Sequence, residues 1–177
     1  MRAVGPAETP ILEHDLRSLL PDAAGVVALV RGQLHSDTAL EVQAVWDVWL
    51  WEAGKWQQRP QPLSIICVGQ AYDDEAWREA GHFQADIGFE HVFTGRAGLL
   101  SGRFEAQAQH AAEAEFLRAM AQPEPLREYR EKTRENVRQL LDWVRASEEA
   151  LPVECWRLWS EEEEDFEARL DDILAGG

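Results

Sequence analysis

Polar and apolar residues alternate over residues 81–95, and the residues best suited to chemistry occupy the polar positions of this stretch. These polar positions are occupied by His82, Gln84, Asp86 and Glu90. His82 and Asp86 could act as an acid and a base or bind a metal ion, because alternate residues of a strand share a face. Four residues along a strand nevertheless span roughly 13 Å, whereas two ligands of one zinc ion each lie about 2 Å from it. The pair therefore needs a residue from a neighbouring strand or a bulge at Gly88, and a solvated outer face is the simpler interpretation.

A glycine-rich stretch, TGRAGLLSGR at residues 94–103, is the best candidate for an anion site. It combines three glycines with two arginines, and we expect a helix to begin directly after it, near Phe104. Backbone N–H groups at a helix start attract anions, but the motifs G-x-x-x-x-G-K-S/T and G-x-G-x-x-G are both absent. We predict a ligand site formed by Arg96, Asp86 and His82. The alternative is that the stretch is only a strand-to-helix connection.

The remaining reactive residue types form no catalytic or metal-binding pattern. The serines lie outside G-x-S-x-G, H-E-x-x-H is absent, and the acidic stretch 73–75 lacks the spacing of a calcium loop. Cys67 lies in an apolar run, and Glu154 would raise the pKa of the neighbouring Cys155 thiol. We predict no catalytic residue, no metal and no cofactor. His91 occupies one of the apolar positions in residues 81–95, so we expect it to be partly buried and hydrogen-bonded.

Four of the eight tryptophans fall within WDVWLWEAGKW, residues 46–56. On a regular strand, one apolar face holds Trp46, Val48 and Leu50. Trp49 and Trp51 lie on the opposite face, and a turn near Gly54 would bring Trp56 across to them as a cross-strand aromatic contact. This second face is open to three interpretations, which are core packing, a protein–protein patch and a small-ligand pocket.

A second aromatic pair, Trp156 and Trp159, stands just before an acidic run. Residues 147–177 hold eleven acidic and two basic residues, so they carry −9 of the net charge of −16. Acidic charge beside aromatic side chains suits a basic protein partner, and a homodimer is the alternative. The predicted partner-binding residues are Trp49, Trp51, Trp156, Trp159 and Glu162. Trp49 and Trp51 are covered by the Trp156/Trp159 segment, by a second copy or by a partner.

The composition argues against two classes of partner. Nucleic-acid binding needs a basic stripe, which is unexpected with 17 basic and 33 acidic residues. An anionic membrane surface is disfavoured for the same reason, and no apolar run approaches the roughly 20 residues that cross a bilayer. The N-terminus has no apolar stretch typical of a secretory signal. Two cysteines outside a C-x-x-C spacing indicate buried thiols in a reducing cytoplasm.

The periodicity of apolar residues predicts the elements that position these side chains. Residues 10–20 are expected to form a helix between two prolines, and residues 25–37 to contain a strand bounded by glycines. The further strands are expected within residues 39–56, 62–72 and 81–95, with a helical turn or loop at 73–81. The further helices are expected at residues 104–120, 125–151 and 160–174. Ser160 and Glu163 have the spacing of a capping box at the start of the last helix.

These elements predict an α+β fold in one domain, residues 1–177, strand-rich over 25–95 and helical over 104–177. An antiparallel meander of about four strands is covered by one N-terminal helix and about three C-terminal helices. For function we expect a non-catalytic, acidic protein that binds a basic partner, in the manner of an inhibitor or immunity protein. The alternative is a protein or enzyme that binds a small molecule or anion near the 94–103 loop.

Overall fold

The computed structural model describes residues 1–5, 10–18, 23–32, 35–73, 77–96, 99–100, 108, 110–161 and 164–176. Contacts between residues divide the chain into two compact units. Unit 1 consists of Met1–Trp46 and Gln61–Gly88, and unit 2 consists of Asp47–Pro60 and Phe89–Gly177. Each unit therefore joins two stretches that are distant in the sequence. The single domain expected from the sequence stays a prediction.

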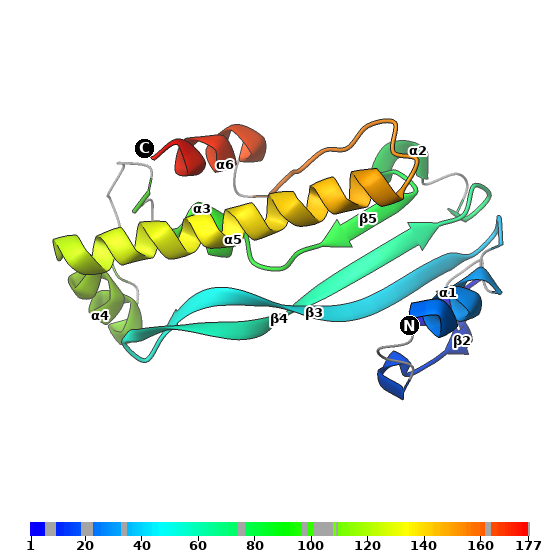
Figure 1. Ribbon diagram of the computed structural model, residues 1–177, viewed down its shortest axis with the longest axis horizontal. Helices are drawn as coiled ribbons and strands as arrows, with labels where there is room; N and C mark the ends of the chain where they lie inside the picture. Colours follow the sequence, from blue (N-terminus) through cyan, green and yellow to red (C-terminus); the bar gives the residue numbers. More distant parts are fainter. Residues whose placement is uncertain are drawn as a thin grey trace. The chain divides into compact units, whose positions relative to one another are not determined.

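Unit 1 is built on a five-stranded sheet with the strand order β2-β1-β3-β4-β5 (Figure 1). The strands are β1 Arg2–Val4, β2 Pro10–Glu13, β3 Ala39–Glu52, β4 Lys55–Val68 and β5 Phe83–Asp86. Strand β1 pairs antiparallel with both β2 and β3, and β4 pairs antiparallel with β5. The expected meander is present as β3-β4-β5, and the α+β class is confirmed. The hairpin end of β3 and β4 belongs to unit 2.

Two predicted elements of unit 1 are wrong. The described part of residues 10–20 forms the strand β2 and a 3-10 turn at Leu16–Ser18 instead of a helix. Residues 25–37 contain no strand in their described part, because the β-prone run lies in helix α1, Ala23–Arg31. Helix propensities of ordinary residues differ by less than about 1 kcal/mol, so tertiary pairing overrides them. For β2 that pairing is visible, since Arg2 of β1 lies opposite Glu13.

The strand predicted at the tryptophans is confirmed as β3. The turn that follows it sets the register between β3 and β4. Ala53 and Gly54 both have positive φ angles, 49° and 79°, as a two-residue type I′ turn requires. This turn places Trp51 opposite Trp56 and sets Pro60 and Pro62 at positions whose backbone nitrogens face away from β3. The pairing of β4 with β5 begins only at Ser64. The two prolines therefore lie inside β4 without removing a hydrogen bond from either pairing.

The strand predicted within residues 81–95 is much shorter than expected. Strand β5 ends at Asp86, and residues His91–Thr94 form the short helix α3. The Asp86 carboxylate accepts a hydrogen bond from the Gly88 N–H at 2.9 Å, and Gly88 has a φ of 87°. An aspartate that bonds the backbone two residues ahead makes a turn, so the chain leaves the sheet at this point. The stretch before β5 contains the helical turn α2, Trp77–Ala80.

Unit 2 is organised around the long helix α5, Pro123–Ala150, which α3, α4 and α6 all contact (Figure 1). Helix α4 is Ala111–Met120 and α6 is Phe166–Ala175. The helix predicted at 125–151 is thus confirmed. The predicted start near Phe104 lies outside the described residues. Pro123 occupies the first turn of α5, where its missing N–H does not interrupt the helix.

The predicted start of the last helix is wrong. Asp165, not Ser160, caps α6, and its carboxylate accepts a hydrogen bond from the Ala168 N–H at 3.1 Å. The Ser160 hydroxyl instead donates to the Glu90 carboxylate, which precedes α3. Glu163 lies outside the described residues. A tertiary contact therefore uses the serine that the sequence pattern assigned to a cap.

A buried amide connects three elements of unit 2. Asn136 on α5 is only 1% exposed. Its Oδ1 accepts from the Trp49 N–H at 2.8 Å, and its Nδ2 donates to the carbonyls of Trp49 and Val92, both at 3.0 Å. In the register set by the turn, the N–H and C=O of Trp49 face away from β4. Asn136 therefore replaces a neighbouring strand at Trp49 and joins β3, α3 and α5.

We predict that Asn136→Asp lowers the free energy of unfolding by roughly 3 kcal/mol or more. The substitution keeps the size of the side chain but removes the donor to two buried carbonyls and buries a charge. Urea denaturation at neutral pH measures the loss. Arg138→Ala, at an exposed position of the same helix, is the control and should change stability by less than about 0.5 kcal/mol. Equal stability of Asn136→Asp and the wild type would contradict the assigned role.

Candidate ligand-binding site

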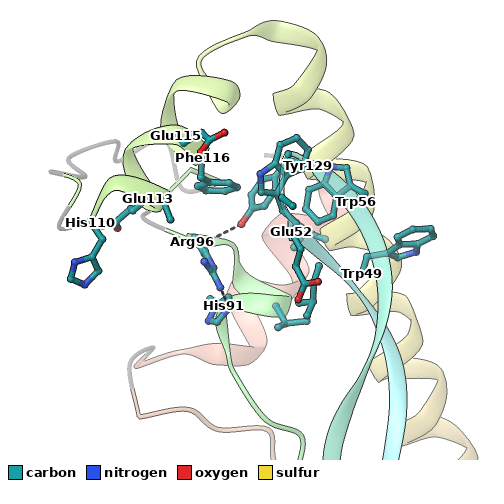
Figure 2. A pocket seen from close by; sticks show the side chains of 17 residues that line it. Trp49, Glu52, Trp56, His91, Arg96, His110, Glu113, Glu115, Phe116 and Tyr129 are labelled. Atoms are coloured by element: carbon teal, nitrogen blue, oxygen red, sulfur yellow. Dashed lines mark hydrogen bonds between the residues drawn. The ribbon is translucent and has the colours of Figure 1, made fainter.

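Unit 2 contains a pocket of about 570 Å³ between the β3–β4 hairpin end, α3, α4 and α5 (Figure 2). Its aromatic lining comprises Trp49, Trp51, Trp56, Phe116 and Tyr129. Its polar lining comprises Glu52, His91, Arg96, His110, Glu113, Glu115 and Thr133. The volume lies within the range of about 300–1,000 Å³ usual for small-molecule sites.

Four of the aromatic rings form a closed cluster at one wall of the pocket. Trp51 contacts Trp56 at a centroid distance of 5.6 Å, which confirms the expected cross-strand pair. Tyr129 contacts Trp56 at 5.4 Å and Phe116 at 5.5 Å, and Phe116 contacts Trp51 at 6.4 Å. Tilted and edge-to-face pairs at such distances add about 0.5–1.5 kcal/mol each beyond area burial. The hairpin turn and the two helices α4 and α5 are thereby held together as one rigid wall.

Arg96 is held at the pocket by its own backbone. Its N–H donates to the Tyr129 hydroxyl at 2.6 Å (Figure 2). The preceding residue, Gly95, has φ 85° and ψ 147°, a region that only glycine populates readily. A Cβ at Gly95 would lie 2.8 Å from side-chain carbons of Leu100 and 3.3 Å from the Tyr129 hydroxyl. The glycine thus permits the close approach that fixes Arg96.

His91 orients the guanidinium group of Arg96. Arg96 Nη2 lies 2.9 Å from His91 Nε2, and because a guanidinium can only donate, the imidazole nitrogen accepts. Burial, and secondly the charge of Arg96, lowers the pKa of His91 to about 4. The imidazole is therefore neutral at pH 7, and none of the ion pairs found in the described part of the chain involves Arg96.

Two other charged groups at the pocket, Glu52 and Lys132, are engaged within the chain. The Glu52 carboxylate forms an ion pair with Arg59 at 2.9 Å. The Lys132 ammonium lies 3.7 Å from the centroid of the Trp49 ring and 3.0 Å from the Glu135 carboxylate. The ring face that could attract a cation from outside is thus occupied by a lysine of the chain itself.

The three predicted ligand-binding residues belong to different units. Arg96 belongs to unit 2 and lines the pocket, whereas His82 and Asp86 belong to unit 1. The His82 ring stacks on Trp77 at 4.4 Å, and its Nδ1 lies 2.9 Å from the Val68 carbonyl. Asp86 makes the turn that ends β5. The pocket is therefore built without His82 and Asp86, because the chain leaves the sheet between them and Arg96.

The predicted partner-binding tryptophans divide into two groups. Trp49 and Trp51 line the pocket, where Lys132 lies over the first and Phe116 contacts the second. These contacts come from α4 and α5, and not from the Trp156/Trp159 segment. Trp156 and Trp159 are 45% and 67% exposed in an irregular segment before α6. Glu162 lies outside the described residues.

Sequence reasoning missed most of the pocket's lining. Tyr129 lies in the helix predicted at residues 125–151, but the role of its hydroxyl depends on a residue 33 positions earlier. His91 was expected to be partly buried and hydrogen-bonded, which the structure confirms. The short spacing from His91 to Arg96 was the one local indication that the two side chains could meet.

The described residues also bear on metal binding and on the reactivity of the two cysteines. Within them no three side chains of the histidine, cysteine, aspartate and glutamate types lie close enough to hold a metal ion. Burial raises the pKa of the half-buried Cys67 thiol. Cys155 is exposed, contrary to the expectation of two buried thiols, because it lies in the irregular segment before α6.

In the part of the chain that the structure describes, no helix is both long and apolar enough to cross a bilayer. A comparison of the chain with protein-family models, curated proteins and solved structures finds no match.

We predict that His91 makes stability fall as the pH drops below about 6.5. The folded pKa of about 4 lies below the ordinary value of 6.5, so the unfolded chain takes up the proton first. The stabilisation is complete above about pH 6.5 and is lost as the pH falls towards 4. Denaturant titrations at about pH 7 and pH 4.5 should give a smaller stability difference for His91→Gln than for the wild type. His110→Gln, at an exposed histidine, should keep the wild-type difference, and an unchanged difference in His91→Gln would refute the assignment.

Proposed function

We propose that the protein binds a small organic molecule in the pocket of unit 2. The observation that carries this proposal is a cavity of about 570 Å³ with an aromatic wall and a fixed arginine. Ligand sites commonly combine apolar and aromatic walls with a few well-placed polar groups. The closed ring cluster also makes this wall preorganised, so that binding orders few side chains.

The lining favours binding over catalysis. The Tyr129 hydroxyl already accepts the Arg96 N–H, and burial raises the pKa of this phenol, so it stays protonated at neutral pH and is not available as a base. His91 accepts from Arg96 and has a depressed pKa, which makes it a weak proton acceptor. Both groups therefore support the position of Arg96, and we propose no catalytic residue among them.

We predict that Ala112→Trp abolishes binding without unfolding the protein. Ala112 is exposed in the first turn of α4 and lines the pocket, so a bulky side chain there would fill the cavity. Ligands found by thermal-shift screening of aromatic acids, alcohols and amines should lose at least tenfold in affinity by calorimetry. The matched control is Ala111→Trp, which is exposed in the same turn and outside the lining. Equal binding by the two variants would rule out this pocket as the site.

A second candidate function is binding of a basic protein. It is favoured by the exposure of Trp156 and Trp159, 45% and 67%, beside a segment with eleven acidic and two basic residues. Aromatic side chains frequently supply most of the binding energy at interfaces, and opposite charge speeds association. A second copy of the chain is the alternative occupant. We propose the cytoplasm as the setting because Cys67 and Cys155 are unpaired, and neither candidate involves nucleic acid.

We predict that Trp156→Ser with Trp159→Ser removes this second activity. Tagged wild-type protein should recover a stoichiometric basic protein from the source cell at low salt, and the recovery should fall as salt is raised because charge attraction is screened. The double variant should lose that protein, whereas Ala112→Trp should retain it. Equal recovery by the wild type and the double variant would exclude the second candidate. So would the absence of any recovered basic protein at low salt.

A further inference from the structure

We propose that the pocket selects a planar organic anion, a flat apolar body carrying a carboxylate or comparable acidic group that binds Arg96. This inference rests on the proposed function, because it names the ligand class of the same pocket. It depends on three features of unit 2, which are the charge of Arg96, the prior engagement of the cation-attracting groups and the position of His91.

The first feature is that Arg96 carries its charge beside a neutral partner. Its guanidinium contacts the imidazole of His91, which is uncharged at pH 7, and the described ion pairs do not include it. A guanidinium presents a planar set of donors that matches a carboxylate in a two-point contact. One contact with His91 leaves other N–H groups of the fork for a ligand oxygen.

The second feature is that the groups able to attract a cation are largely engaged. Lys132 covers the Trp49 ring, and Arg59 neutralises Glu52. These two contacts compete with any cation that approaches the Trp49 ring or the Glu52 carboxylate from solution.

The third feature is that the guanidinium is positioned before a ligand arrives. The backbone of Arg96 is fixed by Tyr129, and the conformation of Gly95 is one that other residues rarely adopt. His91 then holds one end of the side chain. Because the long arginine side chain loses less freedom on binding when it is already held, His91 acts as a positioning residue.

The test compares three probes of one shape by calorimetry at low salt. The probes are naphthoate, neutral naphthylmethanol and the naphthylmethylammonium cation, each substituted at the same ring position. We expect naphthoate to bind at least tenfold tighter than the other two, the size of one charge-assisted hydrogen bond. We expect Ala112→Trp to abolish the binding, which locates it in the pocket.

Variants of Arg96 and His91 separate charge from shape. Arg96→Gln should reduce naphthoate affinity about tenfold and change naphthylmethanol affinity less than twofold. Arg138→Gln, an exposed arginine of α5, is the control and should leave both affinities unchanged. His91→Leu should weaken naphthoate binding severalfold, and His91→Gln, which restores an acceptor, should recover it. Thermal melts confirm that each variant is folded.

The outcomes distinguish the two levels of the proposal. If none of the three probes binds the wild type, both the ligand class and the proposed function fail. If the neutral or cationic probe binds as tightly as naphthoate and Ala112→Trp abolishes it, the pocket is a binding site but the anion inference is overturned. The anion inference is also overturned if Arg96→Gln binds naphthoate with the affinity of the wild type.

Discussion

The folding of unit 2 depends on one backbone constraint at the edge of β3. Near the hairpin, the N–H and C=O of Trp49 face away from β4, and burying them unpaired would cost several kcal/mol. The Asn136 amide satisfies both and also the Val92 carbonyl. A single side chain thus fixes the positions of the hairpin, α3 and α5 relative to one another. These three elements, with α4, form the walls of the pocket.

The aromatic cluster and the arginine follow from that arrangement. Once α5 is held against β3, Tyr129 lies two helical turns before Asn136, where its ring completes the cluster with Trp51, Trp56 and Phe116. The Tyr129 hydroxyl extends from that cluster to the backbone of Arg96. The same residue therefore belongs to the packed wall on its apolar side and to the polar part of the pocket on its hydroxyl side. This connects packing directly to the placement of a charge.

Periodicity predicted the long elements well and the short ones poorly. The strand through the tryptophans and helix α5 each repeat their pattern over many residues, so local preference and burial agree. Residues 10–13 and 23–31 were assigned the wrong type, because a few β-branched or apolar residues carry less free energy than one tertiary pairing. The candidate site was predicted only in part. Arg96 lines the pocket, but His82 and Asp86 belong to the other unit, since Asp86 turns the chain out of the sheet.

The α+β class, the faces on which the tryptophans lie and the turn that brings Trp56 across to Trp49 and Trp51 were predictable from the sequence, because they depend on residues close together in the chain. Tertiary structure alone decided what covers those rings and which polar groups meet them. Asn136 reaches Trp49 across 87 positions, and Tyr129 reaches Arg96 across 33. Contacts of that separation leave no periodic trace in a sequence. They form because buried backbone groups must find partners, and the fold determines which side chain supplies them.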